Sequence, residues 1–179
     1  MATREPMSER PTPESLRAVP LLASLTPDEL RGFAGLGQMQ RIAAQQPLFR
    51  EGDPADSLVL VLRGSAEVVK KDPGGKHQVL AVLSAPAVLG EMTVLEAGAR
   101  RSASALALSP LEAVSVPGAE LRSRLAAGDV VSLKIAAAIA RVLARRLADV
   151  DARLVQLLEA VPQIEQLAEF RRTLERWSD

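Results

Sequence analysis

The feature that most constrains the fold is a run of short apolar segments between Met39 and Val116, each bounded by a turn signal. Apolar and polar residues alternate within these segments, and glycine, proline and aspartate separate them, which is typical of antiparallel strands. Glu51–Pro54 reads as one turn, and Asp72–Gly75 as a turn that closes a hairpin. We predict strands at residues 39–44, 47–50, 57–63, 66–72, 77–83, 101–108 and 111–117. Many short strands at this spacing predict a β-sandwich or a β-roll.

Helical signals flank these strands on both sides. Thr26–Glu29 combines a capping box with proline at the first helical position, so we expect a short helix that fades near residues 35–37. After Pro117 the apolar period becomes helical, which predicts a short helix at 120–125 and a long helix capped by Asp129. The expected fold class is therefore α+β.

The chain divides into four segments by composition. Residues 1–13 carry three prolines and several charges without an apolar cluster, so we expect them to be disordered. Residues 14–128 are expected to form the roll with its flanking helices, and residues 129–160 a long dimerisation helix. Residues 161–179 would form a C-terminal amphipathic helix after the interruption at Pro162. A chain of 179 residues can hold one well-buried core and such an extension.

Apolar residues recur three and four positions apart along the long helix, which is typical of a coiled-coil seam. These positions are Leu133, Ala136, Ala140, Leu143, Leu147, Val150, Leu154, Leu157 and Val161. A second apolar stripe, at Ile135, Ile139, Val142 and Val155, is expected to pack on the roll. A helix with two apolar faces must bury both. We therefore expect a homodimer through the long helix, with the alternative that the C-terminal tail folds back over the seam.

Composition excludes several classes of function. Lys+Arg and Asp+Glu both total 22, so no overall charge favours nucleic acid or an anionic membrane. The absence of cysteine rules out disulfides and thiol nucleophiles, and the single His77 argues against a metal site. Without paired carboxylates in a recognisable setting, we expect no enzyme. The lack of a long apolar run or a signal peptide predicts a cytoplasmic protein that does not enter a membrane. Abundant alanine, leucine and arginine hint at a bacterial gene.

The candidate site is the stretch from Gly90 to Ala103, which reads as a short helical turn between two strands, opening at Gly90 and closing at Gly98. The start of such a turn leaves backbone N–H groups that suit a phosphate. Arg101 and Ser102 could add a guanidinium fork and a hydroxyl group. Glu91 would repel a phosphate unless the same ligand offers hydroxyl groups, and a phosphate joined to a sugar meets both demands.

This spaced set resembles the phosphate-binding cassette of cyclic-nucleotide-binding domains, the module shared by the catabolite activator family, protein kinase A regulatory subunits and cyclic-nucleotide-gated channels. Gly90 and Glu91 match the pair that opens the cassette, and Arg101, Ser102 and Ala103 match its close. The resemblance implies a double-stranded jelly roll, the β-roll of this family.

The resemblance also implies a role for each matching residue. Arg101 and Ser102 would hold the cyclic phosphate, and Glu91 would accept a hydrogen bond from the ribose 2′-OH. The N–H groups from Gly90 to Met92 would assist.

Base recognition is where this chain departs from the family. Bacterial activators present hydroxyl residues to the adenine amino group just after a segment like Ala144–Leu147, but Val150 and Asp151 stand there in this chain. Valine cannot form such a hydrogen bond. Asp151 could accept one from adenine N6, or two from guanine N1–H and N2–H₂, or could simply face solvent. The family's preference suggests cAMP as the ligand, and the aspartate leaves cGMP open.

The function expected from these residues is that of a cyclic-nucleotide receptor. Activators carry a winged helix-turn-helix after the long helix, and the 19 residues after Ala160 leave no room for one, so we expect a stand-alone receptor without direct DNA binding. Its C-terminal helices would then signal to an unknown downstream protein. Two alternatives stay open: a degenerate, non-binding domain that serves as a dimeric scaffold, and a transcription regulator that acts through a separate DNA-binding partner.

Overall fold

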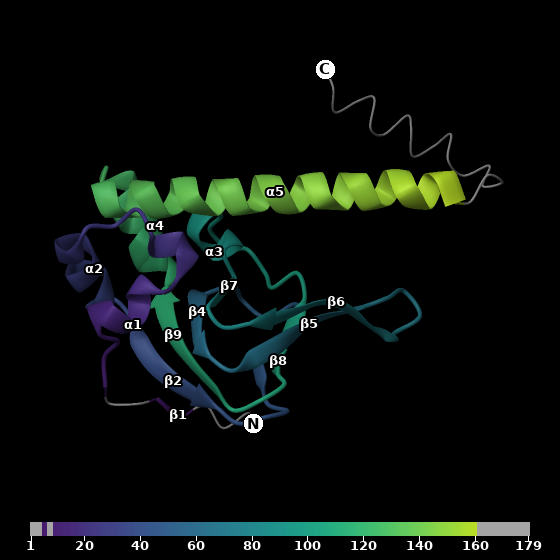
Figure 1. The fold of residues 1–179 in the computed structure, drawn as a ribbon, viewed down its shortest axis with the longest axis horizontal. Helices are drawn as coiled ribbons and strands as arrows, with labels where there is room; N and C mark the ends of the chain where they lie inside the picture. The colour runs from purple at the N-terminus through teal and green to yellow at the C-terminus, as the bar shows by residue number, and fades with distance from the viewer. Residues whose placement is uncertain (1–4, 7–8, 161–179) are drawn as a thin grey trace, which may run out of the picture. The chain divides into compact units, whose positions relative to one another are not determined.

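The computed structural model describes residues 5–6 and 9–160, with side chains from Glu9 to Gln156 (Figure 1). Its helices are α1 (Pro13–Arg17), the 3-10 helix η1 (Pro20–Leu22), α2 (Pro27–Ala34), α3 (Met92–Leu95), α4 (Gly118–Ala126) and α5 (Val130–Ala160). Its strands are β1 (Glu5–Pro6), β2 (Gln38–Ile42), β3 (Pro47–Phe49), β4 (Ser57–Arg63), β5 (Ser65–Lys71), β6 (His77–Ser84), β7 (Ala87–Leu89), β8 (Ser104–Ala107) and β9 (Leu111–Pro117). The predicted α+β fold, with short N-terminal helices and a long C-terminal helix, is confirmed.

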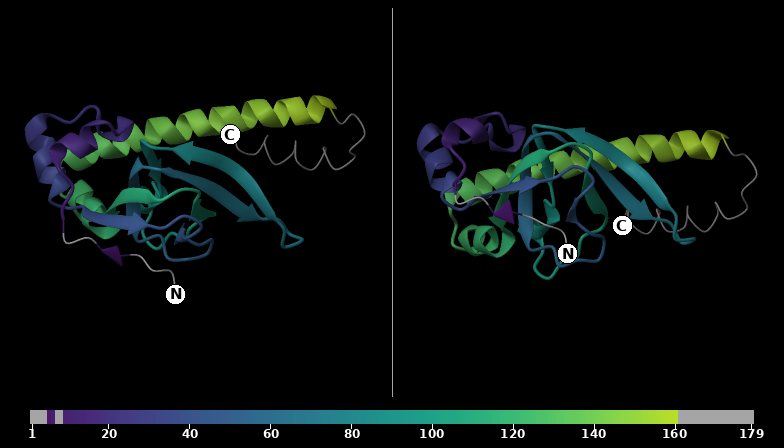
Figure 2. Two further views of the ribbon diagram at one scale, coloured as in Figure 1. Left: turned by 60° about the horizontal axis from the view of Figure 1, so that its bottom comes forward. Right: turned by 90° about the horizontal axis from the view of Figure 1, so that it is seen from below.

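Within the described residues the strands form two antiparallel sheets, in the orders β1-β2-β9-β4-β7 and β3-β8-β5-β6. Apolar side chains from both sheets meet in one core, because alternate residues of each strand point inward. The core comprises Ile42, Leu48, Phe49, Val59, Val61, Ala66, Leu89, Ala105, Ala107, Leu111 and Ala113. The predicted β-roll is thus confirmed, and the hairpin β5–β6 reaches beyond the other strands (Figure 2).

The observed strands depart from the predicted ones at three places. The strand expected at 101–108 begins only at Ser104, because residues 99–101 pair instead with the turn that follows β3. Strand β7 was not predicted, since three residues are too few to show an alternating pattern. In the N-terminal segment, Glu5–Pro6 pair with β2.

The predicted capping box begins α2. Thr26 Oγ1 accepts a hydrogen bond from Glu29 N at 3.3 Å, and Glu29 Oε2 accepts one from Thr26 N at 2.8 Å. Lys134 Nζ lies 2.7 and 2.8 Å from the two carboxylate oxygens of Glu29, which joins the first turns of α5 to α2. The Lys134 ammonium and the Thr26 N–H lower the pKa of Glu29. The Glu29 carboxylate therefore caps α2 and also binds Lys134 of α5.

Asp129 begins α5, as the sequence predicts. Its Oδ2 accepts hydrogen bonds from Ser132 N and Ser132 Oγ, both at 2.8 Å, and these donors lower its pKa. The chain forms two compact units, residues 1–139 and 140–179, so the first turns of α5 belong to the roll. There Ile135 and Ile139, from the predicted second stripe, are fully buried.

In the second unit, α5 carries exposed apolar side chains among the described residues. Leu147 is 60% exposed and Val150 is 59% exposed, and both belong to the predicted seam. The predicted C-terminal helix at 161–179 lies outside the described residues. Among the helices of the described part, none combines the length and apolarity that crossing a bilayer demands.

Candidate functional site

The stretch from Gly90 to Gly98 forms the short helical turn that the sequence predicts. Gly90 has φ +72° and Gly98 has φ +74°, a backbone region that favours glycine, so both ends of the turn are set by residue type. Between them, Thr93 N donates to Gly90 O at 3.2 Å and Val94 N donates to Glu91 O at 3.1 Å. The turn is one helical repeat long and presents Glu91 at its start.

Gly90 and Arg101 touch, although eleven positions separate them in the sequence. A side chain added at Gly90 would collide with Arg101 Nη1 and would also lie 2.9 Å from the carbonyl oxygen of Ser57. Glycine is therefore needed at position 90 for space as well as for its backbone angle. The contact brings the opening and the close of the cassette together, as the resemblance implies.

Arg101 is only 5% exposed and is anchored to the roll by several contacts. Its Nη2 donates to Ser57 O at 2.9 Å and to Ser57 Oγ at 3.1 Å, and it lies 3.4 Å from Asp56 Oδ1. The guanidinium carbon lies 4.2 Å from the centre of the Phe49 ring, within cation–π range. A buried cation is costly unless such partners hold it, so this guanidinium is fixed before any ligand arrives.

Glu91 and Thr93 lie on the inner side of the turn. Glu91 is 7% exposed, and Thr93 is fully buried. The Thr93 hydroxyl donates to Ala55 O, and its carbonyl oxygen accepts from Arg122 Nη1 on α4. These bonds tie α3 to the roll on one side and to α4 on the other, so the Glu91 carboxyl is presented by a fixed backbone.

The turn at residues 51–55 is hydrogen-bonded to the segment that carries Arg101. We call this segment, residues 99–102, the cassette arm. Gly52 N donates to Arg101 O, Arg101 N donates to Asp53 O, and Ala55 N donates to Ala99 O, each at 2.9 Å. Arg100 Nη1 also donates to Gly52 O at 2.7 Å. From the sequence this segment reads only as a tight turn, and the structure adds that it holds the cassette arm in place.

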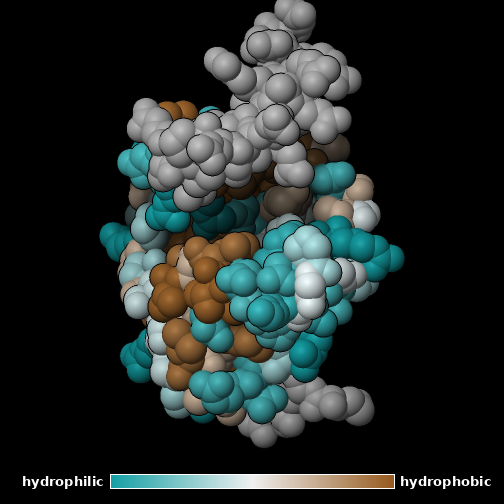
Figure 3. Space-filling view, turned by 90° about the vertical axis from the view of Figure 1, so that its right-hand side faces the viewer, coloured by the Kyte–Doolittle hydropathy of each residue, from teal (hydrophilic) through white to brown (hydrophobic). Residues whose placement is uncertain are grey.

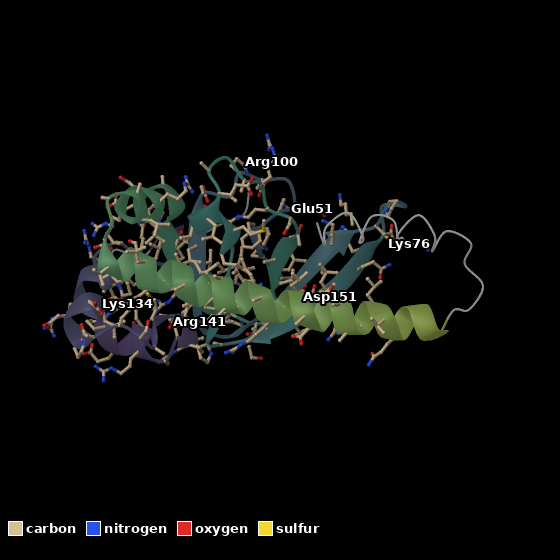
Figure 4. All side chains as sticks on the ribbon, turned by 90° about the horizontal axis from the view of Figure 1, so that it is seen from above. Glu51, Lys76, Arg100, Lys134, Arg141 and Asp151 are labelled. Carbon is tan, nitrogen blue, oxygen red and sulfur yellow. The ribbon has the colours of Figure 1, made fainter. Side chains whose placement is uncertain are left out.

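Strand β5 reaches the same arm through Lys70. Lys70 Nζ donates to Ser102 O at 2.7 Å and lies 3.5 Å from Glu51 Oε1. Glu51 is fixed in turn, since its Oε2 accepts from Lys71 N at 3.1 Å and its N donates to Ser104 Oγ at 2.9 Å. The Lys71 N–H, and then the Lys70 charge, lower the pKa of Glu51. Figure 4 labels Glu51 and Arg100 on this side of the roll.

Of the residues predicted for the site, Gly90 and Arg101 are in contact, and Glu91 and Ala103 are buried in the same cassette. Met92 and Ser102 are exposed, so their side chains face solvent. Asp151 lies on the part of α5 that belongs to the second unit, and its side chain is exposed; its part in binding stays a prediction.

Sequence reasoning missed the residues that hold the cassette from other strands. Phe49, Ser57 and Lys70 lie 52, 44 and 32 positions before the residues they contact. None carries a local pattern, since each is an ordinary strand residue whose role depends on strand pairing. The one feature readable from the sequence is the hydroxyl residue Ser57 at the start of a predicted strand.

The residues present fit a cyclic phosphate joined to a ribose. A pre-positioned guanidinium and the exposed Ser102 hydroxyl suit the phosphate, and a carboxyl group one residue after a space-restricted glycine suits a sugar hydroxyl. The site therefore offers a guanidinium from Arg101 and a carboxyl group from Glu91. A ligand that carries both an anion and hydroxyl groups can bind to both.

Residues 39–127 match the model of the cyclic nucleotide-binding domain family, and through them the chain belongs to that family. The chain is 30% identical to the cyclic AMP receptor protein of Thermus thermophilus over 145 residues, which cover 81% of this chain and 66% of that protein. It is 31% identical to the CRP-like cAMP-activated global transcriptional regulator of Mycobacterium tuberculosis over 111 residues, which cover 62% of this chain and 47% of that protein. The chain thus spans about half to two thirds of the length of these curated relatives.

The fold is also similar to solved structures. A cyclic nucleotide-binding domain from Methylobacillus flagellatus superposes with a TM-score of 0.74, and the match covers 86% of this chain and 88% of that one. Its sequence identity is 23%, so this likeness concerns the fold alone.

Proposed function

We propose that this chain is a receptor that binds a cyclic nucleotide in the cassette at residues 90–103 and signals through its C-terminal helices to a downstream protein. The observation that carries the proposal is the buried Arg101 guanidinium, fixed by Ser57 and Phe49 and seated against Gly90. Such a group offers a cation at a fixed place without further rearrangement, which suits binding of an anion. The chain then acts by binding rather than by catalysis.

Each cassette residue takes one part of the ligand in this proposal. Arg101 and the Ser102 hydroxyl hold the cyclic phosphate, and Glu91 accepts a hydrogen bond from the ribose 2′-OH. Backbone N–H groups from Gly90 to Met92 assist at the phosphate. Charge-assisted hydrogen bonds contribute about 1.5–3 kcal/mol each. Micromolar affinity requires about 8 kcal/mol, so burial of the base must supply part of the binding free energy.

We infer that cAMP is the preferred nucleotide and that Asp151 contributes to the choice of base. The names of the two curated relatives, a cyclic AMP receptor protein and a cAMP-activated regulator, support cAMP. An aspartate can accept a hydrogen bond from the adenine amino group, but it can also accept two from guanine. Competition between cAMP and cGMP on the wild type and on Asp151→Ala tests this part. An unchanged preference in the variant would remove Asp151 from base recognition.

We also propose that the chain forms a homodimer through α5. The exposed Leu147 and Val150 side chains support this, because large apolar groups on a helix are usually covered by a partner. With equal numbers of basic and acidic residues, we expect no direct binding to DNA.

Thermal unfolding of the full chain with cAMP, with cGMP and with the open-ring 5′-AMP tests the receptor function. A ligand at about 100 times its Kd adds about 2.7 kcal/mol of stability, so a cyclic nucleotide should raise the Tm by several degrees while 5′-AMP does not. No shift with either cyclic nucleotide would contradict the proposal and favour a second candidate, a dimeric scaffold, which the exposed apolar residues of α5 support on their own.

A third candidate is a transcription regulator that acts through a separate DNA-binding partner, and the similarity to a global transcriptional regulator of Mycobacterium tuberculosis favours it. Affinity capture with immobilised cAMP-loaded chain distinguishes it from the others. Recovery of a DNA-binding protein, in a cAMP-dependent way, supports this candidate. Recovery of partners without DNA affinity supports the receptor that signals to another class of protein.

A further inference from the structure

Lys70 on β5 holds the backbone of the residue that we assign to the phosphate. Its Nζ donates to the carbonyl oxygen of Ser102 at 2.7 Å, which is a short, charge-assisted hydrogen bond. We propose that Lys70 is a positioning residue for nucleotide binding, acting through Ser102 together with Glu51. This inference rests on the proposed function of the cassette.

The bond matters because of the geometry of the peptide group. In a trans peptide the C=O and the following N–H point in opposite directions, so fixing the Ser102 carbonyl on the Lys70 side directs the Ala103 N–H to the other side. The same contact restricts rotation of the backbone at Ser102, and hence the direction in which its hydroxyl group is presented. An ammonium on the carbonyl oxygen also polarises the peptide and strengthens its N–H as a donor.

Glu51 makes the lysine a defined support rather than a freely moving cation. A lysine side chain loses considerable rotamer entropy when it is fixed. The Glu51 carboxylate lies 3.5 Å from Nζ and is itself held by Lys71 N, so it restrains the ammonium beside Ser102. The Lys70 ammonium group thus connects β5 to the turn at residues 51–55 and to the cassette arm.

An ordinary surface ion pair is the competing explanation, since the Lys70 and Glu51 side chains are 49% and 30% exposed. Exposed pairs contribute little to stability. The two explanations differ in what they predict: an ion pair affects stability slightly and ligand affinity not at all, whereas a support for Ser102 affects affinity and leaves stability nearly unchanged.

Isothermal titration calorimetry with cAMP on the full chain tests the inference, using Lys70→Met with Lys76→Met as its matched control. Both changes remove one positive charge from the β5–β6 hairpin, but Lys76 lies in the turn at its tip (Figure 4). We expect Lys70→Met to raise the Kd about tenfold, corresponding to the loss of one charge-assisted bond. Lys76→Met should stay within about twofold of wild type, and Lys70→Arg, which keeps a charged donor, should restore most of the affinity.

A second readout needs no ligand. In ¹H–¹⁵N NMR spectra of the ligand-free protein, the Ala103 amide resonance should shift in Lys70→Met and not in Lys76→Met, because only the former removes the bond to the Ser102 carbonyl. Equal losses of affinity in both variants would indicate a long-range charge effect and overturn the inference. If Lys70→Met binds cAMP as tightly as wild type does, the inference about Lys70 is wrong and the proposed function still stands. If the wild-type chain binds no cyclic nucleotide, both the inference and the proposed function are wrong.

Discussion

Arg101 donates from Nη2 to the carbonyl oxygen of Ser57, 2.9 Å away, so the residue that we assign to the phosphate is also part of the framework of the roll. The same guanidinium packs on Phe49 and against Gly90. A group held in this way does not need to be ordered when a ligand binds, which lowers the entropic cost of binding. It also means that substitutions at position 101 act on stability and on affinity together.

Replacement of Arg101 is therefore expected to have two separable effects. Arg101→Ala should weaken cAMP binding by at least about tenfold, since the charge-assisted bonds to the phosphate are lost. It should also lower the free energy of unfolding by about 1–3 kcal/mol, because the Ser57 carbonyl loses its buried donor. Calorimetry and urea unfolding measure the two effects. Arg31→Ala, which removes an exposed arginine of α2, is the control. Unchanged cAMP affinity in Arg101→Ala would remove the phosphate role.

The role of Glu91 can be isolated by changing the ligand as well as the protein. Wild type should bind 2′-deoxy-cAMP roughly tenfold more weakly than cAMP, because the carboxylate loses the ribose 2′-OH. Glu91→Gln should weaken cAMP binding and narrow the difference in affinity between the two ligands, because a neutral amide oxygen accepts a weaker hydrogen bond than a carboxylate. Glu96→Gln, an exposed position at the end of α3, serves as control. If Glu91→Gln still discriminates between the two ligands as wild type does, the ribose contact lies elsewhere.

If the chain dimerises through α5, a charged residue at position 147 should disrupt the dimer. Leu147→Asp should give monomers, because a carboxylate at the centre of an apolar seam must be desolvated without a partner. Analytical ultracentrifugation measures the mass, and Leu147→Met, which keeps the side chain apolar, should remain dimeric. A persistent dimer in Leu147→Asp would place the interface outside the seam.

The Asp129 cap predicts how the free energy of unfolding changes with pH. Its pKa in the folded protein is lowered by the Ser132 donors, so it contributes stability above its ordinary pKa that is lost as pH falls through the folded value. Asp129→Ala should cost about 1 kcal/mol near pH 7. Asp129→Asn keeps a capping oxygen and should cost less. Urea unfolding from pH 7 downwards checks this: the gap between wild type and Asp129→Ala should narrow toward acid pH, and a constant gap would mean that the ionised carboxylate does not act as the cap.

The elements set by local chemistry were the ones that the sequence predicted well. The Thr26 capping box, the Asp129 cap and the glycines of the turn at Gly90 each act through neighbours within a few residues, so their patterns are readable without a fold. Strand β7 and the late start of β8 depend on which segment pairs with which, and that choice is made by tertiary contacts.

The candidate site shows the same division. Gly90, Glu91 and Arg101 could be named from their spacing, because the cassette is one continuous stretch. Phe49, Ser57 and Lys70 could not be named, because they act across strands that only the folded sheets bring together. The residues that we assign to the ligand can therefore be predicted from the sequence, whereas the residues that hold them in place are seen only in the fold.

Titration of the purified chain with cAMP and with cGMP tests the central claim most directly. We predict saturable binding of one cAMP per chain with a Kd of roughly micromolar or tighter, and weaker binding of cGMP. The absence of a binding signal for both nucleotides, in a chain that unfolds cooperatively and is therefore folded, would contradict the assignment of this cassette as a nucleotide receptor.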